Sequence, residues 1–521
     1  MKMYDYVIVG AGTAGCVLAA RLSEDPSTRV LLVEAGGKDS KQEIAVPAAF
    51  SKLFDTDFDW GYRTVPQAGL DDRTLYWPRG RVLGGSSSIN AMMWVRGVPA
   101  DYDAWASAGN EGWSYQDVVG FFKRAEDSER LDVEHTGSGG PVTIRDQRDV
   151  NPGTHLFVEA CIRAGLARNR NANAGTNEGV DYTQVNQDRG RRMSMAAAYL
   201  KPAIKRPNLT VVTGAHVTRV VIEGGRAVGV VYVRDGEVAE ARVEAEVILS
   251  GGAVNSPHIL LLSGVGPPDQ LRAAGVDPVV DLPGVGANLI DHLATGIVRG
   301  TSRTDTLVAA ETPRQLAGYL LKRRGLLTSN VGEAHAFFRS RDELEDPDLE
   351  LVFAPVPYLD HGATVPAGHG YTIGVVLLQP MSSGTVTLAS ANPFAHPRID
   401  PAYLSDPGDL DVLRVGLAKA FEVFETPPLS DVVTGWVRPE SAFEDSDAAG
   451  VVRRHAETLY HPAGTCRMGG DEYAVVDATL RVHGVDGLRV VDASVMPTLN
   501  RGHTMAPVVM IAEKAAEMIR S

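Results

Sequence analysis

Two histidines near the C-terminus have the residue type and the surroundings expected of groups that move protons. His461 lies within residues 460–469, and His503 lies within residues 500–507, directly before an apolar stretch with helical spacing. Both segments contain glycine and proline, and catalytic groups are often carried by positioned loops of this kind. A neutral imidazole has a pKa near the usual operating pH, so either ring could accept a proton. Either histidine could instead serve only as a structural hydrogen-bonding group.

A glycine-rich turn at the N-terminus predicts a dinucleotide site. A short apolar run precedes Gly10, Gly12 and Gly15, which have GxGxxG spacing and lead into a helical pattern. The first glycine permits a tight turn, the second lets the backbone approach a pyrophosphate, and the third lets the helix pack on the strand. Glu34 ends the next apolar run, residues 30–33, where a carboxylate can accept both hydroxyls of an adenosine ribose. The fingerprint serves both NAD and FAD, so it does not choose between them.

Two further glycine-rich segments extend the pattern. Residues 79–90 form a glycine- and serine-rich loop with arginine at one end, which offers backbone N–H groups and a cation to a phosphate. Residues 247–266 read as a buried strand, a turn and a helix. Each segment alone is compatible with an ordinary loop or with another unit of an α/β sheet.

Together these segments resemble the glucose-methanol-choline (GMC) family of FAD oxidoreductases, and the likeness covers almost the whole chain. Residues 80–90 fit the first signature of the family and residues 252–266 fit the second; further landmarks lie at residues 58–62, 283–292 and 491–497. The resemblance implies an α/β fold, in which a Rossmann-like FAD-binding domain is interleaved with a substrate domain built on an antiparallel sheet.

The resemblance also implies which residues hold the cofactor. Glu34 would bind the adenosine ribose, Val217 would lie near adenine, and Asp492 would lie near the pyrophosphate and ribityl chain. The expected FAD-binding residues are Gly10, Gly12, Thr13, Ala14, Gly15, Glu34, Ala35, Arg81, Gly84, Gly85, Ser86, Asn90, Val217, Asp492, Ala493, Thr504 and Met505. Some members attach FAD covalently through a histidine just before the asparagine of the first signature. Because Ile89 stands there, we expect non-covalent FAD.

The two histidines match the catalytic positions of the family. In GMC enzymes the first motif supplies the catalytic histidine, which corresponds to His461. His503 matches a second position that holds histidine in some members and asparagine in others. Oxidising an alcohol removes a hydroxyl proton while a hydride leaves the same carbon for flavin N5, and a neutral imidazole suits the proton. We favour His461 as the base and His503 as the group that orients the hydroxyl, although the sequence leaves this choice open.

The substrate residues are less specific. Glu333 matches a carboxylate that faces the ammonium group in choline enzymes, and it could equally be structural. Phe337 and Tyr358 are further expected substrate contacts, and His335 is a weaker one. The expected function is oxidation of a primary alcohol, whether aryl, aliphatic or a sugar, to the aldehyde, with O2 or another electron acceptor. A choline-type dehydrogenase and an FAD-containing hydroxynitrile lyase remain the alternatives.

The length of 521 residues predicts two domains. We expect the FAD-binding domain to comprise residues 1–150, 199–300 and 453–521, and the substrate domain to comprise residues 151–198 and 301–452. Residues 372–377 and 384–388 read as strands of the substrate-domain sheet.

Composition limits the partners. A net charge of −15 argues against nucleic acid and anionic membranes as partners. The 3 cysteines are far apart, which excludes a redox dithiol and a thiolate metal site and fits a reducing compartment. No apolar run is long enough to span a bilayer and no metal-ligand spacing is evident. Because no leader is recognisable at the N-terminus, the expected location is cytoplasmic.

Overall fold

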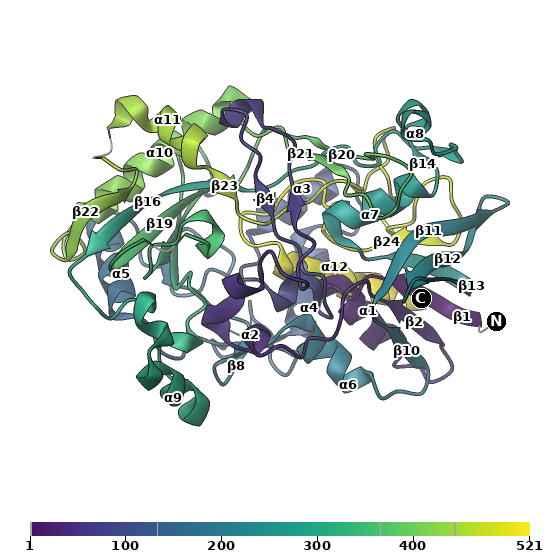
Figure 1. Ribbon diagram of the computed structural model, residues 1–521, viewed down its shortest axis with the longest axis horizontal. Helices are drawn as coiled ribbons and strands as arrows, with labels where there is room; N and C mark the ends of the chain where they lie inside the picture. Colours follow the sequence, from purple (N-terminus) through teal and green to yellow (C-terminus); the bar gives the residue numbers. More distant parts are fainter. Residues whose placement is uncertain (1–2, 133, 365, 442–443) are drawn as a thin grey trace.

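The computed structural model describes residues 3–132, 134–364, 366–441 and 444–521, and two large sheets organise them (Figure 1). A seven-stranded sheet lies on the right of Figure 1 and a six-stranded sheet lies on the left. Each sheet is packed against helices through its own apolar core.

The seven-stranded sheet is parallel in its centre. In spatial order its strands are β10 (Leu209–Val212), β2 (Val30–Val33), β1 (Met3–Val9), β13 (Glu237–Leu249), β12 (Arg226–Arg234) and β11 (Ala215–Glu223), with β24 (Leu488–Val490) paired to β13. Strands β10, β2, β1, β13 and β24 run parallel, whereas β11, β12 and β13 form an antiparallel meander. Parallel strands are covered on both faces, which is why β2 is entirely apolar and buried. The Rossmann-like prediction is confirmed.

The first and last helices join the two ends of the chain. Helix α1 (Thr13–Leu22) is almost wholly buried and packs against α12 (Met505–Arg520). Arg21 of α1 forms an ion pair with the buried Glu513 of α12, at 2.8 Å between Nη2 and Oε1. Tyr199 donates a hydrogen bond to the same carboxylate. The N-terminal glycine turn and the segment that carries His503 are therefore fixed relative to each other.

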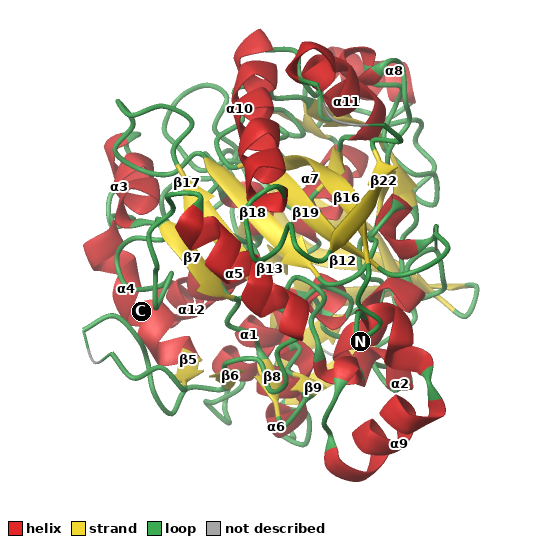
Figure 2. Cartoon of the chain, turned by 90° about the vertical axis from the view of Figure 1, so that its left-hand side faces the viewer, coloured by secondary structure: helices red, strands yellow, loops and turns green. Residues whose placement is uncertain are grey.

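The six-stranded sheet is antiparallel throughout, which confirms the expected character of the second sheet. Its strands are β17 (Ala334–Phe338), β18 (Leu349–Ala354), β19 (Gly370–Leu377), β16 (Leu293–Thr301) and β22 (Val433–Arg438), with β23 (Glu457–Thr458) paired to β16. Helices α10 (Pro407–Phe424) and α5 (Pro152–Arg163) lie across one face of the sheet, as Figure 2 shows.

One predicted strand of this sheet is wrong. Residues 384–388 do not join the six-stranded sheet, because β20 (Thr385–Thr387) pairs with β21 (Arg398–Asp400) in a separate two-stranded sheet. The N–H of Val386 donates to the carbonyl of Gly286, and the N–H of Gly384 donates to that of Leu289. These bonds tie the segment to the loop before His292 instead.

Both sheets draw on segments that are far apart in sequence. Strand β16 and strand β23 belong to the six-stranded sheet although they lie in ranges that we predicted for the FAD-binding domain. The exact domain boundaries stay a prediction.

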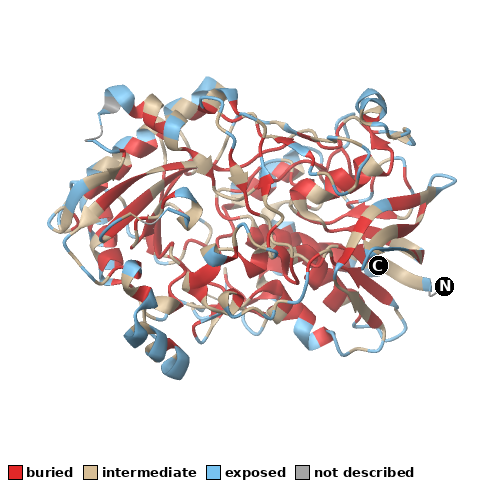
Figure 3. Cartoon of the chain, in the orientation of Figure 1, coloured by how far each residue is buried: buried red, intermediate tan, exposed pale blue. Residues whose placement is uncertain are grey.

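The remaining longer helices lie around the two sheets. They are α3 (Pro99–Ser107), α4 (Tyr115–Ala125), α7 (Gly252–Leu262), α8 (Pro268–Ala274), α9 (Pro313–Lys322) and α11 (Ala448–His455). Burial is continuous through both sheets and the helices between them, whereas α9 is largely exposed (Figure 3). Within the described ranges, none of the helices combines the length and the apolar character needed to cross a bilayer.

Candidate active site

One cavity of about 420 Å³ runs between the two sheets. At one end it reaches Gly10 and Glu34, at the carboxyl ends of β1 and β2. At the other end it is lined by residues of β16, β18 and β19, and the loops that carry His461 and His503 form the wall between the two ends. A cavity at the carboxyl edge of a parallel sheet is the usual ligand site of such folds.

Most of the predicted site residues meet in this cavity. Those that line it are Gly10, Gly12, Thr13, Ala14, Glu34, Ala35, Gly85, Ser86, Asn90, Val217, Tyr358, His461, Asp492, Ala493, His503, Thr504 and Met505. They come from segments up to about five hundred residues apart, and the two sheets bring them together.

Three predicted cofactor residues lie outside the lining and shape it from behind. A Cβ built on Gly15 would lie 1.9 Å from the carbonyl oxygen of Gly10, so only glycine allows this helix–strand contact. Gly84 has a left-handed φ of 92° and donates its N–H to the carbonyl of Ala11. Arg81 stacks over the ring of Trp60 and faces a smaller neighbouring cavity. The packing predicted for Gly15 is therefore seen, and the contribution of all three residues to cofactor binding stays a prediction.

Two residues that we predicted to contact the substrate, Glu333 and Phe337, also lie outside the cavity lining. The Glu333 carboxylate is fully buried outside the cavity, where it accepts hydrogen bonds from Ser329 Oγ, Thr154 Oγ1 and the N–H of Asn151 at 2.6–2.8 Å. Phe337 is fully buried in β17, in a small apolar cluster with Val95, Ala172, Val376 and Leu378. These contacts leave neither side chain free to touch a substrate.

The nucleotide end of the cavity fits a dinucleotide. Gly12 is the N-cap of α1 and no side chain caps this helix, so its first N–H groups are open to a pyrophosphate. A Cβ on Gly85 would lie 2.7 Å from the Cα of Gly12, which shows how closely the two glycine loops approach. The Glu34 carboxylate is held by the N–H groups of Ala11 and Gly36, each at 2.7 Å.

Asp492 ties the C-terminal segment to the first turn of α7. Its Oδ2 accepts from the N–H of Gly252 at 2.8 Å and from Ser256 Oγ at 2.6 Å, and its Oδ1 accepts from the N–H of Ser494 at 2.8 Å. Burial raises the pKa of this carboxyl group, and the four hydrogen bonds it accepts oppose that shift. The cavity wall at Ala493 is thereby fixed.

His461 is held in one tautomer by a second histidine. Its Nδ1 lies 2.9 Å from Nδ1 of His292, whose Nε2 lies 3.1 Å from the carbonyl oxygen of Leu378. Because a carbonyl only accepts, Nε2 of His292 carries a proton. Burial lowers the pKa of His292 to about 4, so this ring is neutral and its Nδ1 accepts from His461. His461 is then protonated at Nδ1, and its Nε2 keeps a free lone pair.

Burial lowers the pKa of His461 well below its usual value, and the neighbouring His503 and His292 lower it further. His461 is therefore neutral at pH 7, as a proton acceptor must be. The rings of His461 and His503 meet edge to face with their centroids 5.0 Å apart.

His503 is anchored by a buried carboxylate. Its Nε2 lies 3.1 Å from Oε1 of Glu350, which also lies 3.6 Å from Nδ1 of His335. Burial would raise the pKa of Glu350, but the two histidines outweigh it and lower that pKa to about 2. Glu350 is therefore ionised and accepts the Nε2 proton of His503, which fixes the orientation of that ring.

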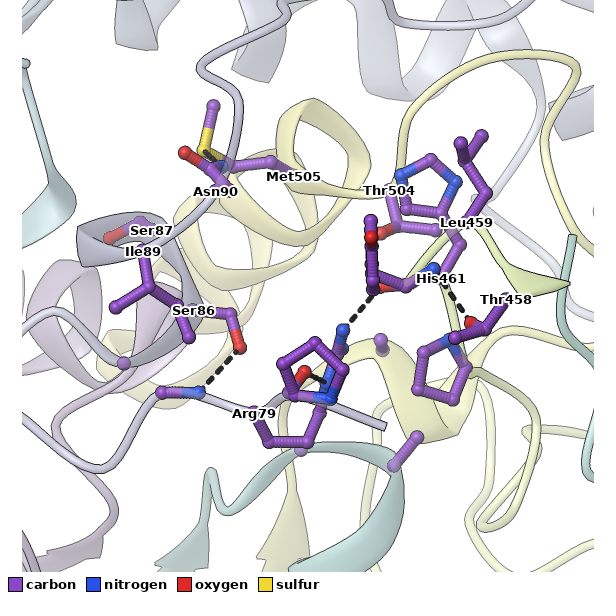
Figure 4. A pocket seen from close by; sticks show the side chains of 18 of the residues that line it. Arg79, Ser86, Ser87, Ile89, Asn90, Thr458, Leu459, His461, Thr504 and Met505 are labelled. Atoms are coloured by element: carbon purple, nitrogen blue, oxygen red, sulfur yellow. Dashed lines mark hydrogen bonds between the residues drawn. The ribbon is translucent and has the colours of Figure 1, made fainter. Parts of the chain in front are cut away.

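The backbone before His461 is strained and well supported. Tyr460 has a left-handed φ of 70°, which is costly for a residue with a side chain. Arg79 donates to the carbonyl of Tyr460 at 2.7 Å, and the N–H of His461 donates to Asp291 at 2.8 Å. Figure 4 shows Arg79 beside the loop that carries His461. These bonds aim the imidazole into the cavity.

Sequence reasoning missed several residues of this site. The Asp291-His292 pair lies in a segment that we identified only as a family landmark, and that signal could have found it. Glu350 gave no signal, because its strand reads as ordinary alternation and its partner His503 lies 153 residues away.

Known proteins resemble this chain over its whole length. Models of the GMC oxidoreductase family match residues 4–294 and residues 380–512. The alcohol dehydrogenase (acceptor) of Pseudomonas putida is 45% identical, with 99% of this chain and 96% of the relative covered. The mitochondrial choline dehydrogenase of Mus musculus is 42% identical, with 99% and 89% covered.

A solved structure agrees with these matches. A formate oxidase variant of Aspergillus oryzae, studied for FAD modification, superposes with a TM-score of 0.94 at 29% identity, with 100% of this chain and 98% of that chain covered. The two family models together span well over half of the chain. The chain is a member of the GMC oxidoreductase family.

Proposed function

We propose that this protein oxidises a neutral primary alcohol to the aldehyde with FAD as hydride acceptor and His461 as base. The observation that carries the proposal is the free Nε2 of His461, held in that state by His292 at the wall of a cavity that also fits a dinucleotide. The activities of the alcohol dehydrogenase and choline dehydrogenase relatives support the reaction class.

The cofactor would occupy the nucleotide end of the cavity and reach the two histidines. Glu34, Val217 and the N-terminus of α1 would hold the ADP half, and the segment from Ser86 to Asn90 with Thr504 and Met505 would hold the flavin ring. Ile89 supports non-covalent binding, since its side chain cannot form the linkage that a histidine forms. When bound, FAD accepts the hydride from the alcohol carbon.

The residues of this chain handle the proton and the orientation. His461 Nε2 accepts the hydroxyl proton as the hydride leaves, so no free alkoxide forms. His503, whose ring orientation is fixed by Glu350, would position the alcohol beside the base. Thr504 caps α12 without a side-chain hydrogen bond, so the positive end of this helix faces the cavity.

The lining of the substrate end of the cavity favours a neutral alcohol. Its wall includes the apolar side chains of Phe50, Phe54, Val298, Val331 and Val352.

The two carboxylates at this end are already paired. Asp360 contacts Arg438 at 3.1 Å, and Glu457 contacts Arg73 and, at 3.3 Å, His361. With Glu333 turned away, no lining carboxylate in the described part of this end is left for an ammonium group. A choline-type substrate would lose its counter-charge here.

A panel of alcohols tests the proposed substrate class. We expect kcat/KM for benzyl alcohol and medium-chain aliphatic alcohols to exceed that for choline by at least ~100-fold, because an ammonium group would be buried unpaired. Turnover is measured with oxygen and with an artificial acceptor, so that either electron acceptor is detected. Choline as the preferred substrate would overturn the assignment.

The lowered pKa of His461 predicts a specific pH profile. The base works only when neutral, so the rate falls as the pH drops through its pKa. An ordinary histidine would lose half its rate near pH ~6.5. With a lowered pKa, we expect flavin reduction at saturating alcohol to stay constant from pH ~8 down to pH ~6.5 and to fall only below that. A stopped-flow series measures this rate, and an apparent pKa of about 7 or above would contradict a lowered pKa for His461.

A further inference from the structure

Arg192 is a buried cation for which the chain provides no carboxylate. It ends β9 (Arg191–Arg192) and is 6% exposed. Its Nε donates to the carbonyl of Ile44 at 2.8 Å, and its Nη1 donates to the carbonyl of Ser87 at 3.2 Å and to Oδ1 of Asn90 at 2.6 Å. Nη2 is buried and has no hydrogen-bond partner among the described residues.

A cation buried in this way needs a counter-charge. Arg96 is buried equally deeply and has one, because its guanidinium pairs with the carboxylate of Glu126. Within the described residues Arg192 contacts only neutral oxygens. Burial lowers the pKa of Arg192 to about 9, so the group is still charged at pH 7. Buried charges are normally paired, and the missing negative charge therefore points to a ligand.

The contacts of Arg192 lead directly to the cavity. Ser87 and Asn90, which it binds, both line the cavity in the segment proposed to hold the flavin ring. Asn90 also contacts Met505, with Nδ2 3.1 Å from Sδ, and Figure 4 shows these two side chains facing each other. Met505 begins α12, whose positive end faces the same space. The guanidinium and the helix end thus raise the positive potential at one end of the flavin position.

We propose that Arg192 stabilises the negative charge that the flavin acquires on reduction. Arg192 would act from behind the cavity wall, through its hydrogen bonds to Asn90 and to the carbonyl of Ser87. The inference rests on the proposed function. In the proposed reaction His461 would accept the hydroxyl proton, and a bound FAD would accept the hydride, which is two electrons and one proton. Because no second proton is added, the reduced ring would carry one negative charge, and Arg192 would supply the positive charge opposite it.

The midpoint potential of the bound flavin tests this proposal. In Arg192→Gln the reduced flavin should bind at least about tenfold more weakly relative to the oxidised flavin, which is a fall of about 30 mV for a two-electron couple. Arg192→Lys keeps the charge and should keep most of the potential. The matched control is Arg191→Gln, which removes an exposed neighbouring charge and should leave the potential unchanged.

A second variant keeps the test open if Arg192→Gln does not fold. Asn90→Asp has the same size as the native residue and places a carboxylate against the guanidinium, at the position of the 2.6 Å contact. We expect this variant to lower the potential as well. A role in folding alone predicts that Asn90→Asp and Arg192→Gln change the melting temperature and leave the potential unaltered, and that result would overturn the inference. If the purified protein contains no flavin, the proposed function fails instead, so the two failures are distinguishable.

Discussion

Replacing His461 with alanine is expected to slow reduction of the bound flavin by an alcohol by about 100- to 10,000-fold, with FAD retained. The imidazole takes the hydroxyl proton through Nε2. Among the described residues that line the cavity, His461 is the side chain that His292 holds as a neutral proton acceptor. The affinity for FAD should change little, because the expected nucleotide contacts lie at the far end of the cavity. Stopped-flow absorbance of the flavin measures the rate.

A histidine outside the cavity provides the control. The Nε2 of His483 forms a hydrogen bond with the carbonyl of Gly469 at 3.1 Å, and Gly469 lies in the segment that follows His461. His483→Ala therefore tests whether disturbing this segment alone slows the reaction. We expect the control to reduce its flavin within about threefold of the native rate, as is usual for a change away from the reacting atoms. Native turnover in His461→Ala would remove this residue from the mechanism.

Replacing His292 with leucine should slow flavin reduction by roughly 10- to 1,000-fold, although His292 does not touch the substrate. Without the acceptor at 2.9 Å, the proton of His461 can move to Nε2, and the ring is then in the wrong tautomer. The pKa of His461 should stay below its ordinary value in this variant, because leucine keeps the burial that is the main cause of the lowering. KM should change less than kcat, since binding of the alcohol is not altered directly.

Glutamine at the same position is the matched variant. Its carbonyl oxygen can accept from Nδ1 of His461, and its amide can donate to the carbonyl of Leu378. His292→Gln should therefore recover most of the rate that His292→Leu loses. Equal rates in the two variants would show that His292 has only a packing role.

Short-range patterns predicted the cofactor half of the fold well. The apolar runs before Gly10 and before Glu34 are β1 and β2, and the GxGxxG spacing forms the expected turn into α1. The apolar pattern after His503 is α12, which begins at Met505. These elements are set by local periodicity and by glycine, so the sequence carries their signal.

Contacts between residues far apart in sequence determine the features that the sequence pattern predicts wrongly. Residues 384–388 have a strand pattern, but they do not join the six-stranded sheet, because Gly384 and Val386 donate their N–H groups to the carbonyls of Leu289 and Gly286 instead. Glu333 matched a cavity position, yet three hydrogen-bond donors turn its carboxylate into the protein. In both cases the pattern gave the residue type correctly, and the partner that fixes its direction lies far away in sequence.

Long-range contacts also position the charged and titratable residues that lie behind the cavity wall, which the sequence did not predict. Arg192 lies in a polar stretch that we assigned to the substrate domain, and the structure places it behind Ser87 and Asn90. Glu350 and His335 are on neighbouring strands and meet His503 only in the folded protein. Charges brought together by long-range pairing leave no periodic signal in one sequence.

Anaerobic mixing of the purified protein with a neutral primary alcohol distinguishes alcohol oxidation from other uses of FAD. The proposed function predicts a yellow protein whose flavin absorbance bleaches on mixing, while the aldehyde appears in a one-to-one ratio with the flavin. A flavin that stays oxidised with every alcohol of the panel would contradict it, and would favour a lyase that binds FAD without using it as an oxidant.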